Sequence, residues 1–206
     1  MRSERFGVLF VCTGNICRSP TAEAVFRKLV ADSGLSEAIA ADSAGTHGYH
    51  IGEPPDPRSA EAAAERGYDL SALRARRIEH ADFGRFDLLV AMDRGHLAIL
   101  SRMADPSSAH KLKLMMSYAS GFRVEDVPDP YYGGPRDFEC VLDMLEDAAR
   151  GLLDAIGRPA AGEIARAWAP GCRASSAPGP EARRCRPEEG AARASPGRTR
   201  RREEAR

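Results

Sequence analysis

A cysteine and an arginine near the start of the chain are spaced like a nucleophile and an anion clamp. Residues 12–20 read Cys-Thr-Gly-Asn-Ile-Cys-Arg-Ser-Pro, so five residues separate Cys12 from Arg18. The spacing alone carries little weight, because 27 of the 206 residues are arginine. The context matters more: the stretch follows a short apolar run, opens a helical pattern, and contains Gly14, which lets backbone N–H groups turn inward. Such a loop at a helix N-terminus can cradle an anion.

The chemistry that this loop predicts is attack by a thiolate on a phosphoryl group. Arg18 can hold a phosphate dianion through two parallel hydrogen bonds, and the same positive field favours the thiolate form of Cys12. Ser19 can donate its hydroxyl to the sulfur. The product would be a phosphocysteine that water hydrolyses. We expect no metal and no cofactor, because Arg18 and the loop amides neutralise the developing charge. The alternatives are an inert buried thiol, a solvated arginine and a helix-capping serine.

A thiolate nucleophile also needs an acid to protonate the departing oxygen. Residues 127–134 read Val-Pro-Asp-Pro-Tyr-Tyr-Gly-Gly, which places Asp129 between two prolines that restrict the backbone. Tyr131 and Tyr132 can form apolar walls for an aromatic leaving group. Without the first motif, this segment would be interpreted as an ordinary turn with surface tyrosines.

Strand and helix patterns alternate along the first three quarters of the chain. Continuous apolar runs indicate strands that are buried on both faces, and apolar residues at helical spacing indicate the helices between them. This alternation predicts a parallel sheet with helices on both faces, with the candidate residues at the carboxyl ends of the strands. The expected strands are 6–11, 38–43, 87–92 and 111–116, and the expected helices are one from the first loop to about residue 34, 57–65, 94–102 and 138–156.

The end of the chain differs in composition from the rest. Residues 1–157 hold 18 Lys and Arg against 24 Asp and Glu, whereas residues 158–206 hold 12 Arg against 6 Glu. From Ala169 onward there is no large apolar or aromatic residue, so this segment cannot bury enough surface to fold. We therefore predict one domain, 1–157, and a disordered basic tail, 158–206. Because Glu interrupts the Arg clusters, we do not expect the tail to bind nucleic acid.

The sequence shows neither a membrane-spanning segment nor a secretory signal. It has no apolar run of membrane-spanning length and no secretory signal at its N-terminus, so we expect a cytoplasmic protein that does not bind membranes.

Several motifs together resemble the low-molecular-weight protein tyrosine phosphatases. The similarity spans roughly residues 5–157 and rests on VCTGNICRSP, DSAG at 42–45, PPDPRS at 54–59, FDLLVAMD at 86–93 and DPYYG at 129–133. The resemblance implies a flavodoxin-like fold with a four-stranded parallel sheet. It also implies a hydrolase that dephosphorylates phosphotyrosine, with Cys12 as nucleophile, Arg18 as clamp and Asp129 as general acid.

The same resemblance assigns supporting roles around the phosphate-binding loop. Asn15 and Ser43 brace the loop by hydrogen bonds, Ser19 supports the thiolate, and Tyr49 lies at the pocket rim. Ile16 occupies a position where arginine-phosphate phosphatases of this family carry Thr. Cys17 matches a second cysteine that can trap an oxidised Cys12 as a disulfide, although a small packing residue is an equal alternative. The remaining loop residues, which would line the bound phosphate, are Thr13 and Gly14.

Other functions remain as alternatives on the same fold. Arsenate reductases of this fold use further cysteines after the third strand, and residues 80–110 contain none. An arginine-phosphate phosphatase and a non-catalytic phosphate-binding module are the other candidates, but a binding module has no use for an acid such as Asp129. The expected partners are phosphotyrosine proteins, with a tyrosine autokinase as one candidate; the sequence does not indicate an oligomeric state.

Overall fold

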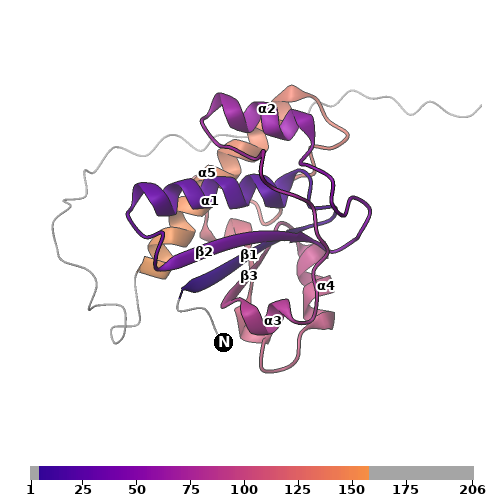
Figure 1. Ribbon diagram of the computed structural model, residues 1–206, viewed down its shortest axis with the longest axis vertical. Helices are drawn as coiled ribbons and strands as arrows, with labels where there is room; N and C mark the ends of the chain where they lie inside the picture. The colour runs from indigo at the N-terminus through magenta and orange to yellow at the C-terminus, as the bar shows by residue number, and fades with distance from the viewer. Residues whose placement is uncertain (1–4, 158–206) are drawn as a thin grey trace, which may run out of the picture.

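Four parallel strands form the centre of the molecule, in the order β2-β1-β3-β4 (Figure 1). The computed structural model describes residues 5–157. The predicted four-stranded, flavodoxin-like sheet is confirmed, including the reversal of strand order beside the first strand that is typical of this fold. The strands are β1 Phe6–Cys12, β2 Ile39–Gly45, β3 Leu88–Ala91 and β4 Leu112–Leu114.

Helices cover both faces of this sheet. In Figure 1 the helices α1, α2 and α5 lie above the strands, and α3 and α4 lie below. Local signals explain where several of them begin: Asp56 caps α2 by accepting the backbone N–H of Arg58, and Asp93 caps α4 by accepting that of His96. The helices are α1 Arg18–Asp32, α2 Pro57–Glu65, α3 Asp82–Arg85, α4 Arg94–Met103 and α5 Pro135–Gly157.

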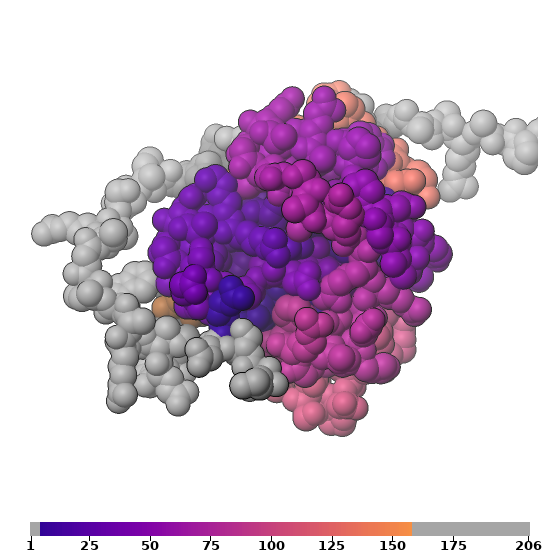
Figure 2. Space-filling model, in the orientation of Figure 1, coloured from indigo at the N-terminus to yellow at the C-terminus, as the bar shows by residue number. Residues whose placement is uncertain are grey.

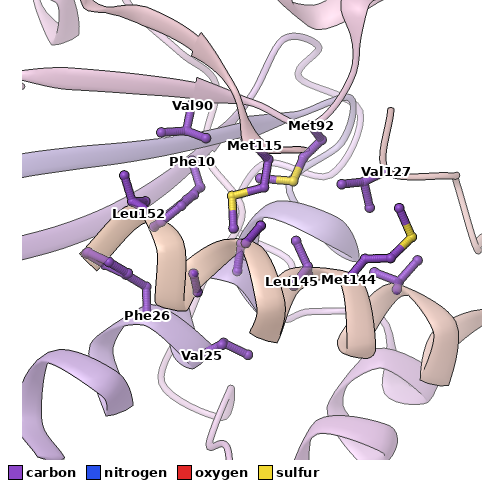
Figure 3. Close-up of a cluster of buried hydrophobic side chains, with 14 of the residues drawn as sticks. Phe10, Val25, Phe26, Val90, Met92, Met115, Val127, Met144, Leu145 and Leu152 are labelled. Atoms are coloured by element: carbon purple, nitrogen blue, oxygen red, sulfur yellow. The ribbon is translucent and has the colours of Figure 1, made fainter. Parts of the chain in front are cut away.

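The core alternates from one face of β1 to the other. Val8 and Phe10 point toward α1 and α5, whereas Leu9 and Val11 point toward the side of α3 and α4. Figure 3 shows the first of these clusters, in which Phe10 lies close to side chains of α1 and α5. All four side chains are fully buried, so close packing on both faces holds β1 in place. This packing also fixes the position of Cys12, the last residue of the strand.

Most predicted elements match the structure within a few residues, but the fourth strand is shorter than predicted. It ends at Leu114, and Met115–Tyr118 form a turn of 3-10 helix. The physical reason is that Met115 and Met116 are both buried in the cluster under α5, whereas consecutive strand residues face opposite sides. The short helix α3 and a 3-10 turn at Ala109–Lys111 were not predicted. The predicted tail, 158–206, lies outside the described residues.

The carboxyl ends of the strands meet at one edge, where the chain supplies several loops. The loop after β1, the end of β2, the residues after β3 and the segment 124–134 all reach this edge. Figure 2 shows the same orientation with all atoms drawn, in which the indigo atoms of the N-terminal part lie between purple segments above them and pink segments to their right. Within residues 5–157, no helix has the length and apolar character needed to cross a membrane.

Candidate active site

The loop from Cys12 to Arg18 joins β1 to α1 and is held by backbone hydrogen bonds from a neighbouring segment. The amides of Thr46 and His47 donate to the carbonyls of Cys12 and Thr13 at 2.8 and 3.0 Å. Gly45, at the end of β2, packs directly against this loop: a Cβ there would lie 2.8 Å from the carbonyl oxygen of Thr13. Only glycine allows β2 to approach the loop so closely.

Asn15 gives the loop its unusual backbone shape. It has φ of 59°, in the left-handed region, and is 1% exposed. Its side-chain amide donates to Ser19 Oγ at 2.9 Å and to Ser43 Oγ at 2.8 Å, while its Oδ1 accepts the backbone N–H of Arg76 at 2.9 Å. Both donors and the acceptor oxygen of this amide therefore help to hold the loop, which offsets the cost of the strained backbone.

Cys12 lies at the floor of the loop, and its sulfur is 3.0 Å from Ser19 Oγ. Ser19 is fully buried in the first turn of α1 and accepts a hydrogen bond from Asn15. Its own hydroxyl hydrogen can then be donated to the sulfur of Cys12, with the carbonyl of Ala44 at 3.3 Å as a second acceptor. The helix N-terminus adds positive potential at the same place.

Arg18 is 4% exposed and joins the loop to two other parts of the edge. Nη1 donates to Asp93 Oδ2 at 2.9 Å and to the carbonyl of Val127 at 3.1 Å, and Nη2 donates to Asp129 Oδ2 at 2.8 Å. Nη2 also lies 3.4 Å from Thr13 Oγ1. The predicted clamp and the predicted acid are thus direct neighbours.

These residues line a pocket of about 290 Å³. Tyr49, Tyr131 and Tyr132 form its rim, and Tyr49 and Tyr132 are 72% and 93% exposed. The rings of Tyr131 and Tyr132 meet edge to face, with centroids 5.0 Å apart. All the residues predicted for nucleophile, clamp, acid and rim therefore converge on one opening, and the loop residues that line it are Thr13, Gly14, Ile16 and Cys17.

The segment that carries Asp129 is anchored at its start and on its side. The amide of Val127 donates to the carbonyl of Met92 at 2.8 Å. The guanidinium of Arg58, from α2, lies over the rings of Tyr131 and Phe138, 5.5 and 4.8 Å from their centroids. These contacts fix the direction in which the segment approaches the pocket.

Asp93 is a site residue that the sequence did not reveal as such, although its motif was noted. It follows β3 at the carboxyl edge, which is a signal that points to a functional position. Burial alone would raise its pKa, but the close contacts with His96 and the nearby guanidinium of Arg18 outweigh burial and hold the pKa of Asp93 well below its usual range. Asp93 is therefore a permanent negative charge behind Arg18.

Glu23 and His50 are two further residues that sequence reasoning missed. Glu23, in α1, is 2% exposed and accepts a hydrogen bond from Ser43 Oγ at 2.6 Å, with Arg27 at 2.7 Å on its other oxygen. Burial raises its pKa, against the opposing effects of Ser43 and Arg27. His50 lines the pocket and lies against Gly14, so closely that a Cβ on Gly14 would be 2.9 Å from the imidazole. No sequence pattern distinguishes either residue from an ordinary surface group.

The two cysteines of the loop have different environments. Both are free thiols. Burial raises the pKa of Cys17 to about 12, with smaller contributions from the negative charges nearby. Cys17 is therefore a neutral thiol at physiological pH. Both cysteines line the pocket, and Cys12 is the one whose sulfur lies beside Ser19.

Together, the fold and the pocket define an α/β domain of the kind that presents a thiol, a guanidinium and a carboxylate around an anion-sized cradle. The chain matches the family model described as low molecular weight phosphotyrosine protein phosphatase over residues 7–161. It belongs to this family.

Individual known proteins match about three quarters of the chain. A low molecular weight protein-tyrosine-phosphatase from Streptomyces coelicolor is 50% identical over 163 residues, which cover 78% of this chain and 99% of the relative. A crystal structure of a protein tyrosine phosphatase from Entamoeba histolytica, with Hepes in its active site, matches with a TM-score of 0.72 and 38% identity over 74% of this chain and 97% of that one. Wzb from Vibrio vulnificus, in complex with benzylphosphonate, matches with a TM-score of 0.64 and 29% identity over 73% and 98%.

Proposed function

We propose that this protein hydrolyses phosphotyrosine in proteins through a phosphocysteine intermediate. The observation that carries the proposal is the meeting of Cys12, Arg18 and Asp129 at one pocket, although Asp129 lies more than 100 residues after the other two in the sequence. Membership of a phosphatase family supports the same conclusion.

In the proposed first step, the phosphoryl dianion lies over the loop amides and against Arg18. The sulfur of Cys12 attacks phosphorus, so that an S–P bond forms while the P–O bond to the tyrosine breaks. Asp129 gives its proton to the departing phenolic oxygen. Arg18 and the inward-facing amides stabilise the charge on the three equatorial oxygens.

In the second step, water replaces the phenol. Asp129, now a carboxylate, takes a proton from the water, whose oxygen attacks phosphorus. The S–P bond breaks, and the products are inorganic phosphate and the thiolate of Cys12. Ser19 stabilises this thiolate by donating its hydroxyl hydrogen, and the network of Asn15 and Ser43 keeps Ser19 in place.

The rim of the pocket supports an aromatic substrate. Tyr49, Tyr131 and Tyr132 provide flat apolar walls, and Ile16 places an aliphatic chain among the lining residues. A phenyl ring can pack against such walls and against the Ile16 side chain better than the planar cation of a phosphorylated arginine can. Benzylphosphonate, which is bound by the relative from Vibrio vulnificus, has an aromatic ring and an anionic phosphonate group and so resembles the phosphotyrosine side chain.

The test is a panel of phosphotyrosine, phosphoserine and phosphoarginine peptides with the purified protein. We expect hydrolysis of phosphotyrosine and little of the other two. Cys12→Ser should lower turnover at least about 1,000-fold while orthovanadate or phosphate still binds, which shows that the pocket is intact. Undiminished turnover in this variant would exclude Cys12 as the nucleophile. Faster hydrolysis of phosphoarginine than of phosphotyrosine would mean that phosphoarginine proteins are the substrates. A tyrosine autokinase as substrate and a cytoplasmic location both stay predictions.

A further inference from the structure

His96 is a buried histidine that the proposed mechanism does not use. It lies in the first turn of α4, and only 4% of its surface is exposed. Burying an imidazole costs free energy unless its nitrogens meet polar partners. The partners that His96 meets are Thr13, which lines the pocket, and Asp93, which binds Arg18, and this distinguishes it from a histidine that fills space in the core.

Each ring nitrogen of His96 faces one of these residues. Nε2 forms a hydrogen bond of 2.8 Å with Thr13 Oγ1, the hydroxyl next to the proposed nucleophile in the sequence. Nδ1 lies 2.9 Å from Asp93 Oδ1, without the alignment of a hydrogen bond. The same carboxylate oxygen accepts the backbone N–H of His96 at 2.8 Å.

Thr13 and Asp93 in turn both contact the guanidinium of Arg18. Asp93 Oδ2 accepts Nη1 at 2.9 Å, and Thr13 Oγ1 accepts Nη2 at 3.4 Å. Thr13, His96, Asp93 and Arg18 therefore form a closed ring of contacts, here called the Arg18 support ring. The imidazole of His96 therefore contacts both the Thr13 hydroxyl and the Asp93 carboxylate, which in turn contact the two terminal nitrogens of Arg18.

We propose that His96 is a positioning residue that sets the orientation of the Arg18 guanidinium for the incoming phosphoryl group. The inference rests on the proposed function, in that the orientation of Arg18 matters because it clamps phosphate. Without the imidazole, the Thr13 hydroxyl loses its buried partner and can rotate away from Nη2, and Asp93 Oδ1 keeps the backbone N–H of residue 96 but loses the ring beside it. The guanidinium then samples more orientations, and binding has to restrict them again.

A purely structural role predicts a different outcome. The cap of α4 depends on the backbone N–H of residue 96, which any residue except proline supplies. An apolar side chain at this place would fill the same volume and leave the helix capped. If His96 served only to pack α4, its loss would change stability and not the properties of the folded pocket.

The experiment compares His96→Leu with His96→Gln in the full-length protein. We measure kcat and KM for para-nitrophenyl phosphate, and the affinity for inorganic phosphate by calorimetry, which needs no turnover. His96→Leu should lower kcat/KM about 10- to 100-fold and weaken phosphate binding. Gln should restore a large part of both, because its amide can reach Thr13 as Nε2 does. A double variant with Thr13→Val should lose little more than the worse single variant, because both substitutions break the same contact.

Leu100→Val is the matched control, because Leu100 is fully buried on the same helix in the cluster below the sheet. It should lower the melting temperature and leave kcat/KM unchanged well below that temperature. Wild-type kinetics and phosphate affinity in His96→Leu, equal losses in the Leu and Gln variants, or additive losses with Thr13→Val would each overturn the role of His96. A wild-type protein that binds phosphate but turns over no phosphate ester would instead overturn the proposed function.

Discussion

The carboxylate of Asp129 lies 2.8 Å from the guanidinium of Arg18, so the proposed acid and the proposed clamp share one hydrogen bond across the pocket. Asp129 is nearly half exposed on its side chain, whereas Arg18 is buried. The acid is therefore presented from the solvent side to a fixed cation. A phosphoryl group that reaches Arg18 necessarily comes within reach of Asp129 as well.

Replacement of Asp129 by Asn should slow poor leaving groups more than good ones. Phenyl phosphate should lose about 100-fold or more in kcat/KM, which reports the first step, and para-nitrophenyl phosphate about 10-fold, because nitrophenolate needs less protonation as it departs. Steady-state kinetics on a series of substituted aryl phosphates measures this difference as a steeper dependence on leaving-group pKa.

Asp126→Asn is the control for this series. Asp126 lies in the same segment and pairs with Arg94 away from the pocket, so its loss should leave the leaving-group dependence as in the wild type. Equal losses of kcat/KM on all esters in Asp129→Asn would mean that Asp129 is not the acid.

The two loop thiols should differ sharply in reactivity. Iodoacetate is an anion and should alkylate Cys12 in the pocket, and inorganic phosphate should protect it. Since the pKa of Cys17 is raised to about 12, only about one Cys17 in 10,000 is a thiolate at pH 8, and this thiol should stay unmodified in the folded protein. Peptide mapping by mass spectrometry after brief labelling separates the two. Rapid labelling of Cys17, with or without phosphate, would contradict this prediction.

Glu23→Gln should change the pH dependence of stability in a definite direction. The unfolded chain ionises Glu23 near its ordinary pKa of 4.5, and burial raises the pKa in the folded protein. Between these two values the folded protein binds more protons than the unfolded chain, so this group lowers the free energy of unfolding as pH rises. The variant lacks this effect, and its stability relative to the wild type should increase as the pH rises above about 4.5, until the folded-state pKa is passed.

Urea unfolding at a series of pH values measures the difference between Glu23→Gln and the wild type. Glu65→Gln, at an exposed position of α2, serves as the control and should show a nearly constant difference. A difference that stays flat, or falls with rising pH, for Glu23→Gln would show that the carboxyl is not held in an unfavourable environment.

Gly45→Ala should displace the phosphate-binding loop, because Gly45 packs against it from the end of β2. The new methyl group would lie 2.8 Å from the carbonyl oxygen of Thr13 and 3.0 Å from that of His47, and backbone atoms can yield only by moving the loop. We expect a loss of about 1–3 kcal/mol in stability and a fall in kcat/KM of about 10-fold or more. Gly84→Ala, where the added carbon meets no atom within 4 Å, is the control. Wild-type activity in Gly45→Ala would mean that the loop tolerates displacement.

The sheet and the main site residues could be predicted because their signals are local. Apolar runs reveal β1 and β3, and the motifs around Cys12 and Asp129 lie at strand ends where ligands gather. Glu23, by contrast, is a charged residue on a helix, and nothing in its neighbourhood reveals that it is buried against Ser43.

The end of the fourth strand and the Arg18 support ring likewise could not be predicted from local sequence. The turn at Met115 depends on how α5 packs, and α5 lies later in the sequence. The role of Asp93 and His96 depends on the contact of α4 with the first loop, between residues 75 or more positions apart. Such contacts follow from tertiary packing, which local patterns do not encode.

The bond from Arg18 to the carbonyl of Val127 has a consequence for synthesis of the chain on the ribosome. Translation makes the loop first and the segment around Val127 more than 100 residues later. During that interval the nascent chain already contains Cys12, but the pocket around this residue is not yet complete. A nascent chain therefore cannot dephosphorylate its surroundings, and its chemistry begins when the last part of the domain folds against the first.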